Sequence, residues 1–148
     1  MLVRVLAMLM LLAGAEASSQ TSEDYAIMGA TAWAAFQCST LVDKTERAEE
    51  RQELFDLGYV NGKAFIEAWQ SGKIEAEHVY RRVPISVLDR LEPLASPQLP
   101  TADFALGAIW EAAARSVLDL IEESAAPIIF AKSEYSQRNC SSLFAISR

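Results

Sequence analysis

Apolar residues recur at steps of three and four between residues 23 and 42, which is the spacing that gathers them on one face of an α-helix. Ser22 offers a capping hydroxyl at the start of this stretch, and Glu23 and Asp24 supply the negative charge that favours the first turn of a helix. We therefore predict a first helix over residues 23–42, with Cys38 on or beside its buried face. The stripe consists of Ile27, Ala30, Trp33 or Ala34, Gln37 or Cys38, and Leu41.

A second apolar stripe predicts a long helix from about residue 46 to residue 71. Gly58 and Gly62 lie one turn apart on this stripe, and each costs about 1 kcal/mol of helix stability relative to alanine. Close approach of another helix at both glycines is the explanation that we prefer. A break of the helix near Asn61 and a ligand that touches bare backbone are the alternatives. The core positions are Leu54, Gly58, Gly62, Phe65 and Trp69.

The pattern becomes irregular after the second stripe. Short helices are expected over residues 75–82 and 86–91, because the apolar spacing is helical there but soon interrupted. Proline cannot donate a backbone hydrogen bond and restricts the residue before it, so the four prolines between residues 84 and 100 break any longer helix. We expect residues 84–100 to be a stiff, proline-rich connector.

From Thr101 a strong helical period returns and continues to about residue 123. This stretch predicts a third long helix, central to the core, with Gly107 on its packing face and Trp110 in the same stripe. The periodic positions are Phe104, Gly107, Ala108, Trp110, Ala114, Val117, Leu118 and Ile121.

The end of the chain is less regular. Pro127 ends the helical pattern, and residues 128–130 form a short apolar run that we expect to be buried, with undecided secondary structure. Residues 133–143 are compatible with a last short helix that carries Cys140. Because only the run at 128–130 resembles a strand, the predicted fold class is all-α, a compact single-domain bundle of three long helices and short accessory helices.

Residues 1–17 have the layout of a cleaved secretory signal peptide. Arg4 precedes an unbroken apolar run, and small residues lead to a cleavage site at Ala15-Glu16-Ala17. The run is too short to cross a bilayer, which takes roughly 20 apolar residues. We therefore expect residues 18–148 to form a single periplasmic or secreted domain, with no membrane insertion after signal cleavage. An uncleaved N-terminal anchor is the alternative.

Composition and motifs argue against several classes of function. The chain has 13 basic and 20 acidic residues and a formal net charge of −7, so a polyanion such as nucleic acid is a poor partner. His78 is the only histidine, which leaves too few ligands for a zinc site. No glycine-rich phosphate loop or other cofactor motif occurs. We assign no metal ligand, no cofactor and no cofactor-binding residue.

Two cysteines, Cys38 and Cys140, are separated by 102 positions. A lone pair of cysteines in an exported domain usually closes on itself, so we predict a disulfide that joins the first helix to the C-terminal segment. Two free thiols or an intermolecular bond are the alternatives. No Cys-x-x-Cys motif is present to activate a catalytic thiol.

Glu67 and Glu111 are the carboxylates closest to the apolar stripes, and paired carboxylates are the groups that cleave glycosidic bonds. Each also has a simpler role. Lys63 lies four residues before Glu67 and Arg115 lies four residues after Glu111, so both acids can form ion pairs on a helix flank. We therefore name no catalytic residue.

Trp33, Trp69 and Trp110 come from three different predicted helices, and each lies on or near an apolar stripe. Indole rings bury a large apolar area and need only one hydrogen-bond partner, so a shared aromatic core is the preferred interpretation. The alternative is a ligand groove lined by the three rings.

These features favour an exported, acidic helical protein that binds another protein in the periplasm, as an inhibitor, an immunity factor or a chaperone. The partner itself is unknown at this stage. Two alternatives remain open. One is a hydrolase of envelope polymers that uses Glu67 or Glu111, and the other is a carrier of a small apolar ligand.

Overall fold

The computed structural model describes residues 20–43, 47–91 and 101–147, and within these ranges every regular element is a helix. The predicted all-α class is confirmed for this part of the chain. The expected signal peptide at 1–17 and most of the expected proline-rich connector lie outside the described residues. Among the helices described, none combines the length and apolar character needed to cross a membrane. They are α1 (Ser22–Asp43), α2 (Ala48–Gln70), α3 (Ala76–Arg82), α4 (Ile85–Leu91), α5 (Ala102–Glu122), α6 (Pro127–Gln137) and α7 (Cys140–Ile146).

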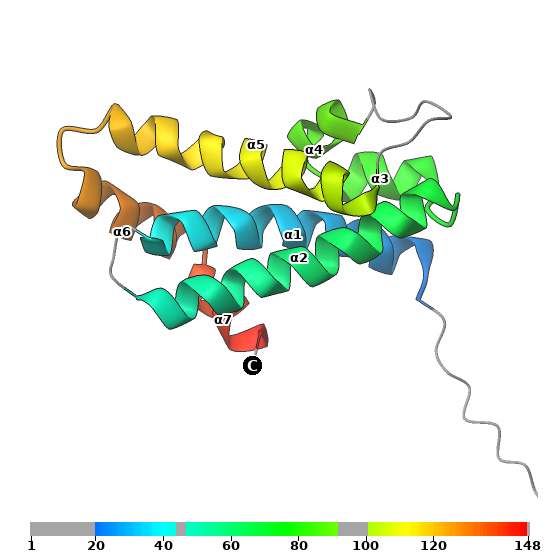
Figure 1. Ribbon diagram of the computed structural model, residues 1–148, viewed down its shortest axis with the longest axis horizontal. Coiled ribbons are helices and arrows are strands. Elements are labelled where there is room, and N and C mark those ends of the chain that lie inside the picture. Colours follow the sequence, from blue (N-terminus) through cyan, green and yellow to red (C-terminus); the bar gives the residue numbers. More distant parts are fainter. Residues whose placement is uncertain (1–19, 44–46, 92–100, 148) are drawn as a thin grey trace, which may run out of the picture.

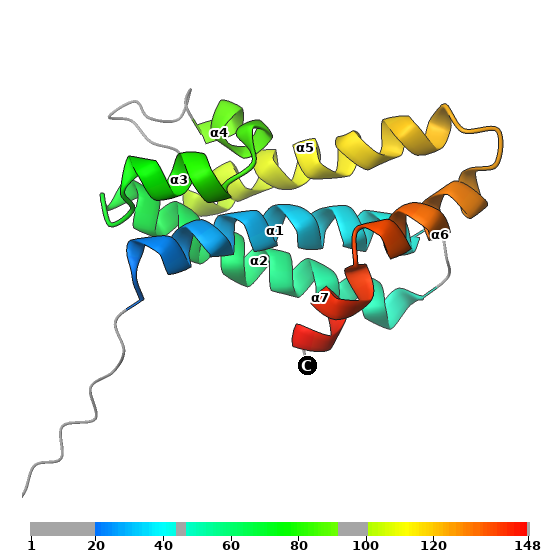
Figure 2. The same cartoon turned by 180° about the vertical axis from the view of Figure 1, so that it is seen from behind.

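Helix α1 runs through the middle of the molecule, between α2 and α5 (Figure 1). Helix α3 lies beside its first half, α4 packs against α5, and α6 and α7 lie beside its second half (Figure 2). Residues 35–39 of α1 are all buried. Because consecutive residues point to different sides of a helix, α1 is covered on more than one side. A helix that is buried on several sides belongs inside a bundle rather than on its surface.

Glycines allow α2 to approach its neighbours closely. A Cβ atom added at Gly58 would lie 2.6 Å from the ring of Phe36 on α1, and one added at Gly62 would lie 2.3 Å from Leu106 on α5. Glycine therefore lets the backbone of α2 occupy positions that alanine would block. Gly107 differs from both. It is exposed and an added Cβ would meet nothing within 4 Å, so the packing role expected for it is wrong.

The first helix is capped by a residue other than the one expected. Thr21 Oγ1 accepts a hydrogen bond from the backbone N–H of Asp24 at 3.1 Å, and Asp24 accepts from the backbone N–H of Thr21 at 2.7 Å. This reciprocal pair is a capping box. Ser22, for which we expected the capping role, instead places its hydroxyl against α3.

The apolar run at residues 128–130 is part of α6 and faces largely outward. Pro127 starts this helix at its first turn, a position where the missing N–H of proline does no harm. Ile128 and Ile129 are 58% and 71% exposed, whereas Ala131 and Tyr135, one turn apart, are buried. The expectation of a buried run is therefore wrong, because the helical period selects other residues for the core.

The predicted disulfide is present between Cys38 on α1 and Cys140 at the start of α7, with Cα atoms 5.6 Å apart. Both cysteines are completely buried. They belong to an apolar cluster that also contains Leu41, Leu54 and Tyr135, separate from the larger cluster around Phe36 and Phe65. Such a bond fits a protein of the periplasm or the cell exterior, where thiols are oxidised.

Candidate functional site

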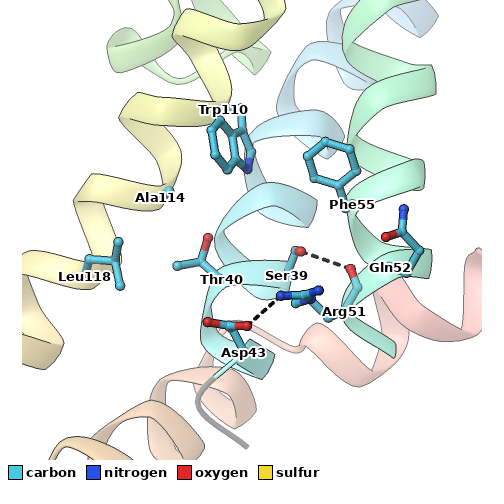
Figure 3. A pocket seen from close by; sticks show the side chains of 9 residues that line it. All are labelled: Ser39, Thr40, Asp43, Arg51, Gln52, Phe55, Trp110, Ala114 and Leu118. Carbon is cyan, nitrogen blue, oxygen red and sulfur yellow. Dashed lines mark hydrogen bonds and ion pairs between the residues drawn. The ribbon is translucent and has the colours of Figure 1, made fainter. Parts of the chain in front are cut away.

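An open groove of about 440 Å³ lies between α1, α2 and α5 (Figure 3). Helices α2 and α5 meet near Gly62 and Leu106 and diverge towards the other end of the molecule, so α1 is uncovered between them (Figure 1). The groove opens where they diverge. Its lining residues are Ser39, Thr40, Asp43, Arg51, Gln52, Phe55, Trp110, Ala114 and Leu118.

The apolar part of the groove is formed by Trp110 and Phe55, which face each other across it (Figure 3). Their ring centroids are 6.2 Å apart and the rings meet edge to face, a favoured aromatic arrangement. Ala114 and Leu118 continue the wall along α5 at four-residue steps. The apolar wall therefore extends over more than two turns of one helix.

Trp110 is 43% exposed, so the core role predicted for it is wrong. Trp33 is buried in the larger apolar cluster, and the partly buried Trp69 packs on Phe65 with ring centroids 6.4 Å apart. The three indoles therefore neither share one cluster nor line one groove. Only Trp110 lies in the groove, because the buried arc of α5 is centred on Ile109, Ala113 and their neighbours.

An ion pair between Arg51 on α2 and Asp43 on α1 closes the polar end of the groove, with 2.8 Å between Nη1 and Oδ1. Both side chains are about half exposed, so the pair is accessible to a ligand. The hydroxyl of Ser39 donates to the backbone carbonyl of Arg51 at 3.0 Å, and that of Thr40 donates to the carbonyl of Phe36. These bonds fix the floor of the groove and leave the ion pair as its adaptable polar part.

A buried polar cluster positions the start of α2 beside the groove. The Tyr135 hydroxyl of α6 donates to Glu50, whose carboxylate also pairs with Arg47 at 2.8 Å. The Arg47 guanidinium lies over the Tyr135 ring, 4.8 Å from its centroid. Burial, followed by the hydrogen bond to Glu50, raises the pKa of the Tyr135 hydroxyl. The carboxylate is fully partnered, so we interpret the cluster as structural.

The two carboxylates considered for catalysis are placed on different helices, and neither lines the groove. Glu111 is exposed and forms the expected ion pair with Arg115 at 3.2 Å. Glu67 is also exposed, but Lys63 pairs with Asp103 at 3.2 Å rather than with Glu67. The structure brings neither carboxylate into a concave site.

His78 joins two helices. Its Nδ1 atom lies 2.7 Å from the hydroxyl of Ser22 on α1, and the same hydroxyl accepts a hydrogen bond from the backbone N–H of Glu75 at 2.8 Å. This arrangement fixes the start of α3 on the start of α1. Within the described ranges, no group of three or more histidine, cysteine, aspartate or glutamate residues is placed to hold a metal ion.

Sequence reasoning missed Ser39, Asp43 and Arg51 as site residues, since their role depends on how far α2 and α5 diverge. One signal was available. Trp110, Ala114 and Leu118 form a stripe beside the more apolar one, and a second stripe on an amphipathic helix indicates a further contact surface.

In comparisons with known proteins, no protein-family model, no curated protein and no solved structure matches the chain.

Proposed function

We propose that the protein is an exported binding protein of the periplasm, which recognises a segment of another protein in the groove between α1, α2 and α5. One observation carries the proposal. A half-exposed tryptophan stands edge to face against Phe55 beside an accessible arginine ion pair. Tryptophan and arginine are enriched among the residues that contribute most to protein–protein binding.

The shape of the groove supports a segment as the occupant. It is open to solvent along the space between α2 and α5, so one or two large side chains can enter while the rest of the partner stays outside. Binding would cover the ring of Trp110, and removing apolar surface from water stabilises a complex by about 25 cal/mol per Å². The Asp43–Arg51 pair can exchange partners with a polar group of the segment.

The location in the periplasm is part of the same proposal. The layout of residues 1–17 is that of a secretory signal, and the buried Cys38–Cys140 bond is suited to an oxidising compartment. A binding protein of this kind would act there as an inhibitor, an immunity factor or a chaperone.

The test is a comparison of Trp110→Ala with Phe104→Ala, which removes an aromatic side chain that is 65% exposed on the same helix but outside the groove. Each protein is immobilised, and proteins retained from periplasmic extract are quantified by mass spectrometry. A partner of the groove should be retained by the wild type and by Phe104→Ala, and about tenfold less by Trp110→Ala.

Equal retention by Trp110→Ala would contradict the proposal, as would the absence of any retained protein at low and moderate salt. A retained partner is then purified and titrated against the wild type. The emission of Trp110 should shift to shorter wavelength on binding, because the ring leaves water.

A second candidate is a carrier of a small apolar ligand. The volume of the groove favours it, since ligand pockets commonly measure about 300–1,000 Å³. Native mass spectrometry of the protein purified from periplasm separates the two functions. A co-purified small molecule that is absent from Trp110→Ala would support a carrier, and a protein without added mass would count against one.

A further inference from the structure

The turn between α5 and α6 presents a run of exposed apolar residues. All residues from 125 to 129 are apolar and exposed, and Ile128 and Ile129 have the largest side chains among them. Single exposed apolar residues are ordinary, whereas an exposed apolar patch marks a site of contact with a protein or a membrane. We call this run the apolar tip; it consists of Ala125, Ala126, Pro127, Ile128 and Ile129.

The apolar tip is a convex projection that is held in place. It lies where α5 joins α6, at one end of the longest axis of the molecule (Figure 1). Directly after the tip, Ala131 is completely buried in the apolar cluster around the disulfide, and Phe130 packs against that cluster. Pro127 restricts the backbone in the first turn of α6. The tip therefore presents its apolar side chains outward from a firm base.

The direction of the side chains places charges behind the apolar end. Cα–Cβ bonds tilt toward the N-terminus of a helix, so Ile128 and Ile129 lean outward at the start of α6. Lys132 is exposed and follows Ile128 by one turn, about 6 Å further along α6. On the other side of the turn, the exposed Glu122 and Glu123 stand at the end of α5. Charges of both signs thus border the apolar end.

The residue types of the tip fit a lipid surface better than a pocket in a protein. Tryptophan, tyrosine and arginine contribute most to protein–protein binding, and the tip contains none of them. Its aliphatic side chains favour any apolar environment equally. The first turn of α6 receives no side-chain hydrogen bond from Ala126 at its N-cap, so the positive end of the helix dipole is accessible to a phosphate.

We propose that the apolar tip docks the protein on the surface of a zwitterionic phospholipid bilayer. Ile128 and Ile129 enter the boundary between headgroups and acyl chains, where amphipathic segments bury their apolar side about 5–10 Å deep. Lys132 then lies among the headgroup phosphates, and Glu123 lies near the ammonium groups. The contact is peripheral, and it goes beyond the proposed function because the tip is separate from the groove.

The overall charge of the chain determines which lipids are favoured. Anionic lipids give a membrane a negative surface potential, which repels a protein with a formal net charge of −7. A headgroup that carries both a phosphate and an ammonium group adds no such potential. The inferred surface is therefore zwitterionic, and anionic lipid should oppose docking most strongly at low salt, where charges are screened least.

Flotation with vesicles tests the inference. Residues 18–148 are purified from the periplasm and identified by mass, because the apolar run near the start of the chain would itself bind lipid. The protein is mixed with vesicles of phosphatidylcholine and phosphatidylethanolamine and centrifuged through a density gradient. The fraction of protein that floats with the vesicles is measured at increasing lipid concentration, which gives a partition constant.

We expect Ile128→Ser with Ile129→Ser to lower the partition constant about tenfold. The matched control is Val60→Ser with Ile85→Ser, which changes aliphatic residues that are 66% and 73% exposed on α2 and α4. This control should change the constant less than twofold. Circular dichroism of each variant verifies that the helices are intact.

The role of Lys132 is tested by a charge reversal. Lys132→Glu should lower the partition constant about threefold, whereas the same change at the exposed Lys73, beyond the end of α2, should have less than a twofold effect. Replacing part of the phosphatidylcholine by phosphatidylglycerol should weaken docking at low salt. Trp110→Ala should float like the wild type, so this result is independent of binding in the groove.

Three outcomes would overturn the inference. The wild type might remain at the bottom of the gradient at every lipid concentration, or the double serine variant at the tip might float as the wild type does. Binding that required phosphatidylglycerol and disappeared with salt would show adsorption by charge instead. Loss of a retained protein from extract in the double serine variant, without any flotation of the wild type, would assign the tip to a protein partner. The retention test with Trp110→Ala decides the proposed function separately.

Discussion

Gly58 and Gly107 are interior residues of helices of similar length, but their surroundings are opposite. Gly58 lies against the ring of Phe36, which is buried, so a Cβ atom added at Gly58 would overlap that ring. Gly107 faces open space. The intrinsic preference of a helix for alanine is the same at both positions, so the difference between the two substitutions isolates the packing of α2 on α1.

Gly58→Ala should lower the free energy of unfolding by about 1–3 kcal/mol, because the strain of an overpacked core exceeds the gain in helix preference. Gly107→Ala should raise it by about 0.5–1 kcal/mol. Urea unfolding followed by circular dichroism measures both. If Gly58→Ala unfolded at the same urea concentration as the wild type, α2 could not lie as close to Phe36 as the structure shows.

Trp110 and Gly107 show that a helical pattern in the sequence does not establish whether an individual residue at the edge of the apolar stripe is buried. Both lie in a stretch with a clear helical period, and the period placed them near the core. The buried arc of α5 is instead centred about a third of a turn away, on Ile109 and Ala113. Alanine and tryptophan are both counted as apolar, so the pattern alone cannot tell which edge of a broad stripe is covered by another helix.

Helix α3 has only seven residues, and side-chain contacts hold it on the start of α1. Besides the bonds of Ser22 to His78 and Glu75, the Arg82 guanidinium donates to the Glu23 carboxylate, with 3.0 Å between Nε and Oε1. That hydrogen bond, and then the charge of Arg82, lower the pKa of Glu23 below its ordinary value of 4.5. The ionised form of Glu23 is therefore favoured in the folded protein.

Arg82→Gln should reduce the melting temperature slightly at neutral pH, and the difference from the wild type should shrink as the pH falls. The folded pKa of Glu23 is the lower one, so its contribution to stability is present above 4.5 and is lost as the pH falls through the folded value. Melting curves between pH 7 and pH 3 measure this. A difference that stayed constant over the range would contradict the assigned ion pair. Arg115→Gln, which removes an exposed pair within α5, is the control.

The extents of the elements were predictable where a periodic pattern had clear boundaries. The first helix was expected over 23–42 and spans Ser22–Asp43, and the one expected to begin at Thr101 spans Ala102–Glu122 with Thr101 as its cap. The segment after residue 127 was less predictable. Its three apolar residues in a row suit a strand and a helix equally, and only contacts with α1 and α5 decide which side of α6 is buried.

The Cys38–Cys140 bond joins two segments that are 102 residues apart. It was predictable because only two cysteines exist, whereas the groove was not, because its width depends on the angle between α2 and α5. Cross-linking so large a loop removes conformational freedom from the unfolded chain and stabilises the fold by up to about 4.7 kcal/mol.

Replacing both cysteines by alanine should therefore lower the free energy of unfolding by about 3–5 kcal/mol. The pair of substitutions avoids leaving one reactive thiol, and urea unfolding gives the free energy. If the folded variant retained the same partner from periplasmic extract as the wild type, the bond would stabilise the protein without shaping the groove. A variant as stable as the wild type would contradict the expected role of the disulfide.

Complete burial of both sulfur atoms has a consequence for how the molecule is made. With only two cysteines in the chain, oxidation has a single intramolecular product, so no incorrect pairing within the chain needs to be rearranged. After folding, glutathione or a thioredoxin-like protein cannot reach the bond without first opening the helices around it. Formation of the bond thus takes a single oxidation of two thiols and no later rearrangement of disulfides within the chain.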